Sequence, residues 1–204
     1  VLISSGSIER PIVFGNNDTP GVMLSSAAKE YMKVYGVLVG KKPLVFTNND
    51  SGYETAIEFK KNGIDPIILD TRKEPQSEII EEAKNMNINI KNSHVVVAAQ
   101  GYKKVKSADI AKISENKEEL GSIENIECDC ICVSGFWTPT IHLASQSGNK
   151  TKFNEDIDAF VPGISKQNEK TLGAANGIYT LEETLKDSFE KGNLLSKNIT
   201  NNEN

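Results

Sequence analysis

Apolar and polar positions alternate along the chain in a way that predicts short buried strands separated by helices. The central stretch, residues 44–72, reads LVFTNNDSGYETAIEFKKNGIDPIILDTR, with an apolar run, a polar turn, a helical pattern and a second apolar run that ends on Asp70. Gly63 stands where helices commonly stop. The pattern therefore predicts a strand at Pro43–Phe46, a helix at Ser51–Lys61 and a strand at Pro66–Leu69.

Similar patterns continue on both sides of this central unit. The elements predicted before it are a strand within residues 1–6, an extended piece at Ile8–Arg10 and a helix at Leu24–Tyr35 ended by Gly36. The elements predicted after it are a helix at Ser77–Met86, two strands within 88–101, an antiparallel flap within 102–128 with a charged hairpin or loop at Ser114–Glu119, and a buried strand in IECDCICVSGF. Together they predict an α/β, Rossmann-like domain with a βαβαβ core and a small β meander.

The composition shifts after Phe136. WTPTIHLASQSGNK is rich in turn formers, and FNEDIDAFVPG is an acidic stretch that returns to a strand. TLGAANGIYTLEETLKDSFEKG predicts a strand, a small-residue turn and a helix, with Thr180 and Glu183 spaced as a capping box. The polar tail from Asn193 is predicted to fray. Because these segments fit neither end of the central domain, we expect the two flanks to pair with each other.

Composition and charge narrow the classes of partner. The 204 residues include 23 basic and 28 acidic side chains, a net charge of -5, and the basic residues are scattered among acids. This balance argues against nucleic-acid binding. The apolar runs are short of a membrane span, and the N-terminus lacks the order of a signal peptide, so we expect a cytoplasmic protein without a membrane partner. Because Val1 already lies in an apolar strand, we expect a piece of a longer protein.

The turn of the central unit departs from a dinucleotide-binding turn. The spacing Gly-x-Gly-x-x-Gly falls here on Thr47, Asn49 and Gly52, so only the glycine for close helix–strand packing is kept. Asn49 blocks the approach of a pyrophosphate, and Asp50 puts a carboxylate where a phosphate would bind. We therefore predict poor dinucleotide binding, although Asp70 lies where a ribose-binding acid would. A simpler interpretation is that Asp50 and Ser51 cap the helix.

Residues that could carry chemistry are few. Cys128, Cys130 and Cys132 alternate, which on a strand would put all three on one face, and burial as small apolar residues is favoured over a metal or redox role. His94 and His142 are each expected to be structural, with His142 the better placed to face a ligand. Trp137 is expected to anchor a loop, with ring stacking as the alternative. No nucleophile–base pattern occurs, so no catalytic residue is predicted.

A second turn is the best candidate for binding a ligand. The residues Gly173, Ala174, Ala175, Asn176 and Gly177 carry no bulky side chain, so backbone N–H groups at a helix start could approach a phosphate or ribose closely. The alternative is a tight packing turn.

Several stretches together resemble one family. ERPIVFGNNDTPGVML, VFTNNDSGY, CDCICVSGFWTPTIHLASQSG, FVPG and GAANG have the order and spacing found in the α subunits of heterotetrameric sarcosine oxidases, and the resemblance covers nearly all 204 residues. It implies that the sequence corresponds to part of a longer subunit, similar to the two-dinucleotide-domain disulfide reductases. The preceding glycine-rich dinucleotide motif and the following folate-binding region of that subunit are absent from this sequence.

The resemblance also implies a domain plan. Residues 1–20 and 137–192 would form part of an outer FAD/NAD(P)-binding-like domain, 21–36 a connection, 37–136 the inserted Rossmann-like domain and 193–204 a flexible tail. Ser4, Ser5 and Gly6 resemble the small-residue turn beside the outer nucleotide site. Asn176 stands where the superfamily has a cofactor-holding acid.

The activity that the resemblance implies belongs to a whole complex. Such a complex oxidises sarcosine to glycine, passes the methyl carbon to tetrahydrofolate and passes electrons through FAD and FMN to oxygen, with NAD held by the α subunit and other subunits as partners. We expect the segment alone to be inactive. Two alternatives stay open: a structural or interaction module with vestigial nucleotide sites, and an α subunit of another amino-acid dehydrogenase complex.

Overall fold

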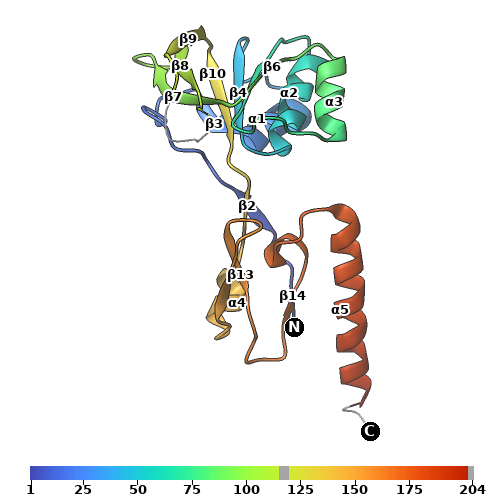
Figure 1. Cartoon of the computed structure of the whole chain (residues 1–204). Helices are drawn as coiled ribbons and strands as arrows, with labels where there is room; N and C mark the ends of the chain where they lie inside the picture. The colour runs from blue at the N-terminus through green and yellow to red at the C-terminus, as the bar shows by residue number, and fades with distance from the viewer. Residues whose placement is uncertain (115–119, 202–204) are drawn as a thin grey trace. The chain divides into compact units, whose positions relative to one another are not determined.

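The chain is described by a computed structural model that covers residues 1–114 and 120–201 (Figure 1). It divides into two compact units. Unit 1 comprises Val1–Ile8 and Trp137–Asn204, and unit 2 comprises Glu9–Phe136. One contiguous stretch of chain therefore forms unit 2, whereas unit 1 is assembled from the two flanks.

Unit 2 is built on a five-stranded parallel sheet. The strand order is β3-β10-β4-β5-β6, from β3 (Val22–Leu24), β10 (Cys130–Ser134), β4 (Pro43–Thr47), β5 (Ile67–Asp70) and β6 (Asn89–Asn92). Three helices connect its strands, α1 (Ser25–Tyr35), α2 (Ser51–Lys61) and α3 (Glu78–Asn85). A three-stranded antiparallel meander follows β6, with β7 (His94–Gln100), β8 (Ser107–Lys112) and β9 (Glu124–Glu127).

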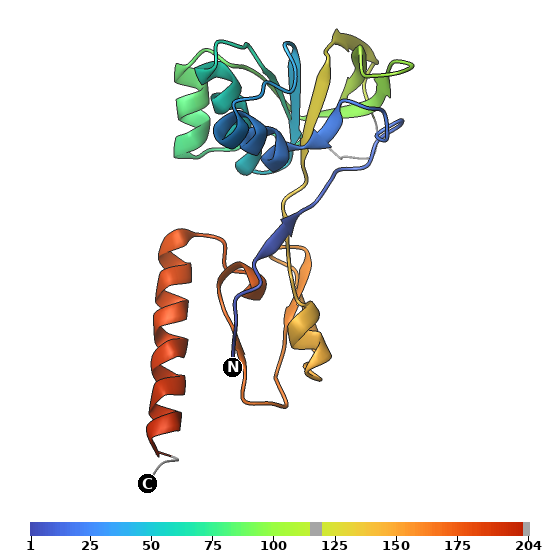
Figure 2. The same cartoon turned by 180° about the vertical axis from the view of Figure 1, so that it is seen from behind.

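These elements form three layers, with the helices on one face of the parallel sheet and the meander on the other (Figures 1 and 2). Strand alternation explains how one strand serves both layers. Val45 of β4 packs in the helix-side cluster, while Leu44 and Phe46 pack in the meander-side cluster. The sheet is covered on both faces, as parallel sheets require, and the predicted α/β Rossmann-like domain with a small β meander is confirmed.

Most predicted elements of unit 2 are found within one or two residues of their expected bounds. The helix predicted at Ser51–Lys61 has those bounds, and Gly36 ends α1 in the left-handed conformation at φ +64. Gly63 also has a positive φ, just beyond the end of α2. The predicted charged loop at Ser114–Glu119 lies outside the described residues apart from Ser114.

The three cysteines do not share one face, which corrects the prediction from their alternation. Cys130 and Cys132 pack in the helix-side cluster, whereas Cys128 packs in the meander-side cluster. The reason is that β10 begins at Cys130, so Cys128 lies before the regular strand. All three are buried free thiols, as predicted. Within residues 1–114 and 120–201, His, Cys, Asp and Glu side chains form no group that could hold a metal ion.

Burial of these thiols predicts slow alkylation of the folded chain. Burial raises the pKa of Cys128 to about 12, and the pKa of Cys132 is raised by its contact with Cys130 and by burial. Because the thiolate is the reacting form, iodoacetamide at pH 8 should leave the three cysteines unmodified in the native chain and modify all three in guanidinium. Mass spectrometry of both samples measures this, and rapid labelling without denaturant would contradict it.

Residues 9–36 lie in unit 2, whereas the sequence-based plan gave 1–20 to the outer domain and 21–36 to a connection. The contacts explain the difference. β3 pairs with β10, and α1 packs beside α2 on the sheet. Glu9 accepts hydrogen bonds from the backbone N–H (2.8 Å) and hydroxyl (2.6 Å) of Ser26, which holds the start of α1. The two ends of unit 2 also pair, since Arg10 donates its N–H to the Phe136 carbonyl at 2.8 Å.

Unit 1 contains short elements from both flanks. β1 (Leu2–Ile3) pairs in parallel with β14 (Lys170–Thr171), and β2 (Ser7–Glu9) pairs with β11 (Trp137–Pro139). The expectation that the flanks pair is confirmed by these two strand pairs. The remaining elements are α4 (His142–Gln146), the antiparallel hairpin of β12 (Thr151–Asn154) and β13 (Ala159–Pro162), a 3-10 turn η1 (Gly173–Asn176) and helix α5 (Leu181–Asn201).

Two features of unit 1 differ from prediction. The short helix α4 lies in WTPTIHLASQSGNK, a stretch rich in turn formers for which no helix was predicted. Helix α5 continues to Asn201, through most of the residues predicted as a flexible tail, while residues 202–204 lie outside the described part. At its start, Glu183 donates its backbone N–H to the Thr180 hydroxyl at 3.4 Å, as in a capping box. None of the helices in the described ranges is long and apolar enough to cross a membrane.

Candidate functional site

The two predicted binding segments of unit 1 leave the same end of one parallel strand pair. Ser4–Gly6 follow β1, and Gly173–Gly177 follow β14. The strands are in register, with Ile3 opposite Thr171, and Leu172 donates its N–H to the Ile3 carbonyl at 2.9 Å. Open α/β sheets bind ligands at the carboxyl ends of their strands. The topology thus brings the two predicted segments to one edge.

The first segment is held by the chain that follows β11. Ser5 donates its hydroxyl to the Thr140 carbonyl at 2.7 Å, and Thr140 donates its N–H to the Gly6 carbonyl at 2.9 Å. Gly6 has φ +73, a conformation that favours glycine, while Ser4 is exposed. This turn is fixed in position and leaves one hydroxyl side chain open to solvent.

The glycines of the second segment make close packing contacts. Gly173 has φ +55, and a Cβ there would lie 2.9 Å from Cγ2 of Thr184 in α5. Gly177 has φ +80, and a Cβ there would lie 3.0 Å from Ile157 and Val161. Both positions therefore need glycine for backbone conformation and for packing. These contacts support the packing interpretation of the turn.

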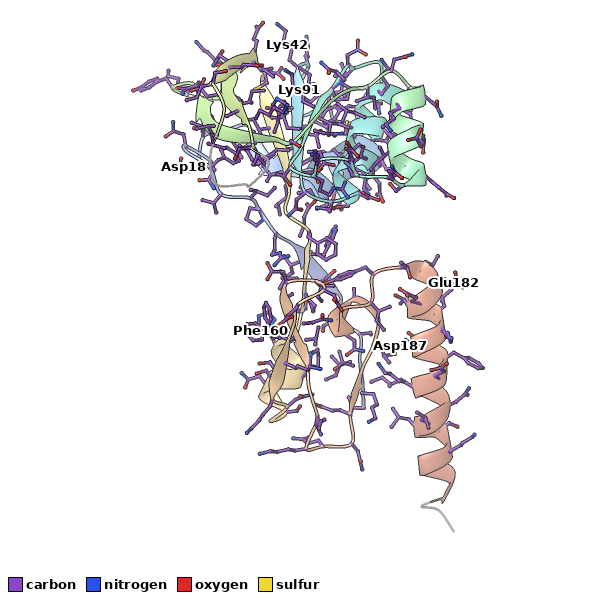
Figure 3. The ribbon with its side chains drawn as sticks, in the orientation of Figure 1. Asp18, Lys42, Lys91, Phe160, Glu182 and Asp187 are labelled. Atoms are coloured by element: carbon purple, nitrogen blue, oxygen red, sulfur yellow. The ribbon has the colours of Figure 1, made fainter. Side chains whose placement is uncertain are left out.

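The charges around the second segment disfavour an anion. Gly173 donates its N–H to the Asp187 carboxylate at 3.3 Å, so this group is already used. Glu182 and Glu183 occupy the first turn of α5, and Figure 3 shows Glu182 at the top of that helix with Asp187 further along it. Asp187 is neutralised by Lys191, whose Nζ lies 2.7 Å from its carboxylate, so Glu182 and Glu183 are the acids that would disfavour a phosphate here. The turn is better suited to neutral hydroxyl groups, such as those of a ribose.

Asn176 also lines a polar cavity of about 330 Å³ within unit 1. Lys191 lines it as well, with its Nζ donating to Asp187 at 2.7 Å and to the Thr171 carbonyl at 2.8 Å. Glu169 is a buried member of the lining, and its carboxylate accepts hydrogen bonds from the Ser147 and Ser165 hydroxyls. The bonds from these two hydroxyls lower the pKa of Glu169, so it stays ionised at neutral pH.

The turn of unit 2 is filled by its own side chains. Asn49 is buried, accepts the Ser51 backbone N–H at 2.9 Å and donates to the Ser134 carbonyl at 3.0 Å. A Cβ on Gly52 would lie 2.6 Å from Cβ of Thr47, so this glycine serves the close helix–strand packing predicted for it. Asp50 occupies the cap position of α2 as predicted, but its side chain makes no cap hydrogen bond, because the Asn49 amide oxygen accepts the Ser51 backbone N–H instead.

Asp50 instead pairs with a residue that the sequence analysis missed. Arg72 contacts Asp50 through Nη1 and Asp70 through Nη2, each at 2.8 Å. Asp70 is fully buried and also accepts the Tyr53 hydroxyl at 2.8 Å and the Arg72 backbone N–H at 2.9 Å. Burial and the bond to Asp70 raise the pKa of Tyr53, which keeps its hydroxyl a donor. Asp70, the acid predicted at the ribose position, is therefore already hydrogen-bonded to side chains of the same unit.

His94, His142 and Trp137, the ring-bearing candidates from the sequence, lie on elements other than these turns. His94 lies on β7 of unit 2, with its Nδ1 2.6 Å from the Asn92 carbonyl oxygen. His142 is exposed at the first position of α4, and Trp137 opens β11, where its carbonyl accepts the Tyr179 hydroxyl at 2.8 Å. His94 therefore has a structural contact, while the role of His142 stays a prediction.

The characterised sequences that the chain resembles are α subunits of sarcosine oxidases. No protein-family model matches the chain. It is 33% identical over 187 residues to the sarcosine oxidase subunit alpha of Corynebacterium sp. (strain P-1), covering 91% of this chain and 19% of that protein. The subunit alpha of Rhizobium meliloti (strain 1021) is 35% identical over 176 residues, covering 85% and 17%. The chain spans about a fifth of the length of these relatives.

Solved structures share the fold at low identity. Thioredoxin reductase of T. acidophilum matches with a TM-score of 0.70 and 16% identity, over 94% of this chain and 62% of that one. L-proline dehydrogenase of P. horikoshii matches with a TM-score of 0.56 and 21% identity, over 86% and 29%. The chain therefore shares its fold with parts of these two proteins, and the resemblance to a part of the sarcosine oxidase α subunits is confirmed over nine-tenths of the chain.

Proposed function

We propose that the chain is a segment of an oxidoreductase α subunit of the sarcosine oxidase type, in which it supplies nucleotide-domain scaffold and part of an NAD site. The observation that carries this is the identity of 33% across 91% of the chain. The parent complex would demethylate sarcosine to glycine in the cytoplasm with tetrahydrofolate, FAD, FMN and other subunits, and release peroxide. The segment alone would be inactive.

In this proposal the NAD would be held at the edge formed by Ser4–Gly6 and Gly173–Gly177. The exposed Ser4 hydroxyl and the partly exposed Asn176 amide suit ribose hydroxyls, whereas the carboxylates of α5 do not suit phosphates. The residues present thus fit the nucleoside part of NAD. Bound there, NAD would supply hydride-transfer chemistry, and the chain's own part is to bind and orient the cofactor.

Titration with NAD tests the proposal. Calorimetry of the whole chain should show saturable heat, and Asn176→Leu should weaken the binding by about tenfold through loss of roughly one hydrogen bond to the ligand. Asn193→Leu, at an exposed position of α5, is the matched control and should bind like the parent chain. Absence of saturable heat from a chain with native circular dichroism would count against an NAD site in this segment.

A second candidate is a structural module whose nucleotide sites are vestigial. The use of the Gly173 N–H by Asp187, and the filling of the unit 2 turn by Asn49, favour it. Silence in the NAD titration would support this function. An α subunit of another amino-acid dehydrogenase complex is a third candidate, and neighbouring genes for flavin and folate subunits would favour sarcosine over it.

A further inference from the structure

The polar cavity of unit 1 has a free hydrogen-bond acceptor in its wall. Asn149 lines the cavity and is only 7% exposed. Its Oδ1 is one of the buried side-chain oxygens of the described residues that have no hydrogen-bond partner. Gly163 lines the same cavity, and a Cβ built there would lie 3.7 Å from this oxygen. Because an unpaired buried acceptor costs free energy, Oδ1 points to a donor that enters the cavity.

The orientation of the Asn149 amide is set by its neighbour. The Nδ2 end of the amide donates a hydrogen bond to the Glu169 carboxylate. Turning the amide over would place Oδ1 against that carboxylate, and two acceptors do not form a hydrogen bond with each other. The free atom is therefore the oxygen, and a ligand that binds to it must donate a hydrogen.

Glu169 adds a negative charge to the wall of the cavity. It is 6% exposed, and its hydrogen bonds come from the Ser147 and Ser165 hydroxyls and from the Asn149 amide. These donors are all neutral, and they keep the carboxylate ionised by lowering its pKa. A buried carboxylate with neutral partners alone favours the binding of a cation beside it.

The cationic groups around the cavity do not fill this role. Lys191 is paired with Asp187, and Lys170 is exposed. The α-ammonium group of Val1 favours the charged form of Glu169, but its own hydrogen bond goes to a backbone carbonyl at 2.8 Å. Across residues 1–114 and 120–201, no ion pair includes Glu169.

We propose that this cavity binds a small ammonium compound, whose N–H groups donate to Oδ1 of Asn149 and to the Glu169 carboxylate. The cavity volume of about 330 Å³ is at the small end for a ligand pocket, which suits a small molecule better than a dinucleotide. Asn176 lines the cavity and also belongs to the edge proposed for NAD. The ammonium site uses other residues and does not depend on NAD binding.

Nuclear magnetic resonance of the isotope-labelled whole chain tests the proposal, with methylammonium chloride as the probe. The signals of the Asn149 side-chain amide and the Gly163 backbone amide should shift saturably. Tetramethylammonium chloride is the matched salt, because it carries the same charge but has no N–H to donate. It should leave both signals in place. The NAD titration has its own readout, so the failure of either site is seen separately.

Two variants assign the binding to the proposed groups. Glu169→Gln should weaken methylammonium binding by at least about tenfold, because it removes a charged acceptor and keeps the shape of the side chain. Glu155→Gln is the matched control, since it makes the same change at an exposed position of unit 1, and it should bind like the parent chain. Asn149→Ala removes the free acceptor and should also lose binding.

Each outcome decides the proposal. Equal shifts with both salts would show a general ionic effect and overturn it. Absence of a saturable shift at Asn149 and Gly163 would overturn it too, and would leave water as the partner of Oδ1. Full binding by a Glu169→Gln chain with native circular dichroism would contradict it as well. If neither variant folds, the comparison of the two salts on the parent chain decides.

Discussion

Replacing Gly52 with alanine should lower the free energy of unfolding by about 2–3 kcal/mol, the upper part of the usual range for overpacking a tight interior contact. The new Cβ would lie 2.6 Å from both Cβ and Oγ1 of Thr47, and Thr47 is fully buried on the central strand β4. Neither the strand nor the first turn of α2 can shift without disturbing the clusters on both faces of the sheet. Urea unfolding followed by circular dichroism measures the change.

Two variants make this prediction specific to the contact with Thr47. Thr47→Gly removes the three side-chain atoms that the new Cβ would meet, so it should recover part of the loss when combined with Gly52→Ala. Gly192→Ala is the matched control, because this helical glycine has nothing within 4 Å of its Cβ position. It should stabilise α5 by about 0.5–1 kcal/mol. A Gly52→Ala chain as stable as the parent would show that strand and helix separate easily.

Asp70→Ala should destabilise unit 2 by about 3 kcal/mol, the lower end of the range for removing one partner of a buried ion pair. The lower end applies because the Arg72 side chain is 33% exposed and water can solvate it. The substitution also leaves the buried Tyr53 hydroxyl without its acceptor.

A double-mutant cycle separates these contributions. Tyr53→Phe alone should cost about 1 kcal/mol, and in the Asp70→Ala background it should cost less, since the hydroxyl is then already unpaired. Additive effects of the two substitutions would contradict a direct coupling between these side chains. Denaturant unfolding of the four chains gives the coupling free energy.

The parts of the fold that sequence predicted are those set by local signals. The helix Ser51–Lys61 follows from the spacing of its apolar residues and from Gly63 beyond its end. α4 has five residues, too few for a helical period to stand out among turn formers. The faces of the cysteines depended on where β10 begins, and that start is set by pairing with β4. Strand alternation alone does not contain this information.

In the candidate site, too, some features could be predicted from the sequence and others depend on how distant segments pair. The loss of two turn glycines and the retention of Gly52 could be seen in the sequence. The pairing of Asp50 with Arg72 could not, because it requires the end of β5 to lie beside the turn after β4, as the register of Thr47 opposite Asp70 provides. An arginine two positions after the strand-end acid was the available signal. Likewise, only the pairing of β1 with β14 brings Ser4–Gly6 and Gly173–Gly177 to one edge.

Residues at the two ends of unit 2 are hydrogen-bonded to each other, which makes the unit easy to exchange as a whole. Gly135 donates its N–H to the Arg10 carbonyl at 2.7 Å, beside the bond from Arg10 to Phe136, so the chain enters and leaves this unit at one point. Because these two ends already meet, a polypeptide that carries unit 2 between two of its own segments loses little extra loop-closure entropy, whatever the length of the unit. Lineages could therefore lengthen, trim or replace the whole unit without redesigning the surrounding polypeptide.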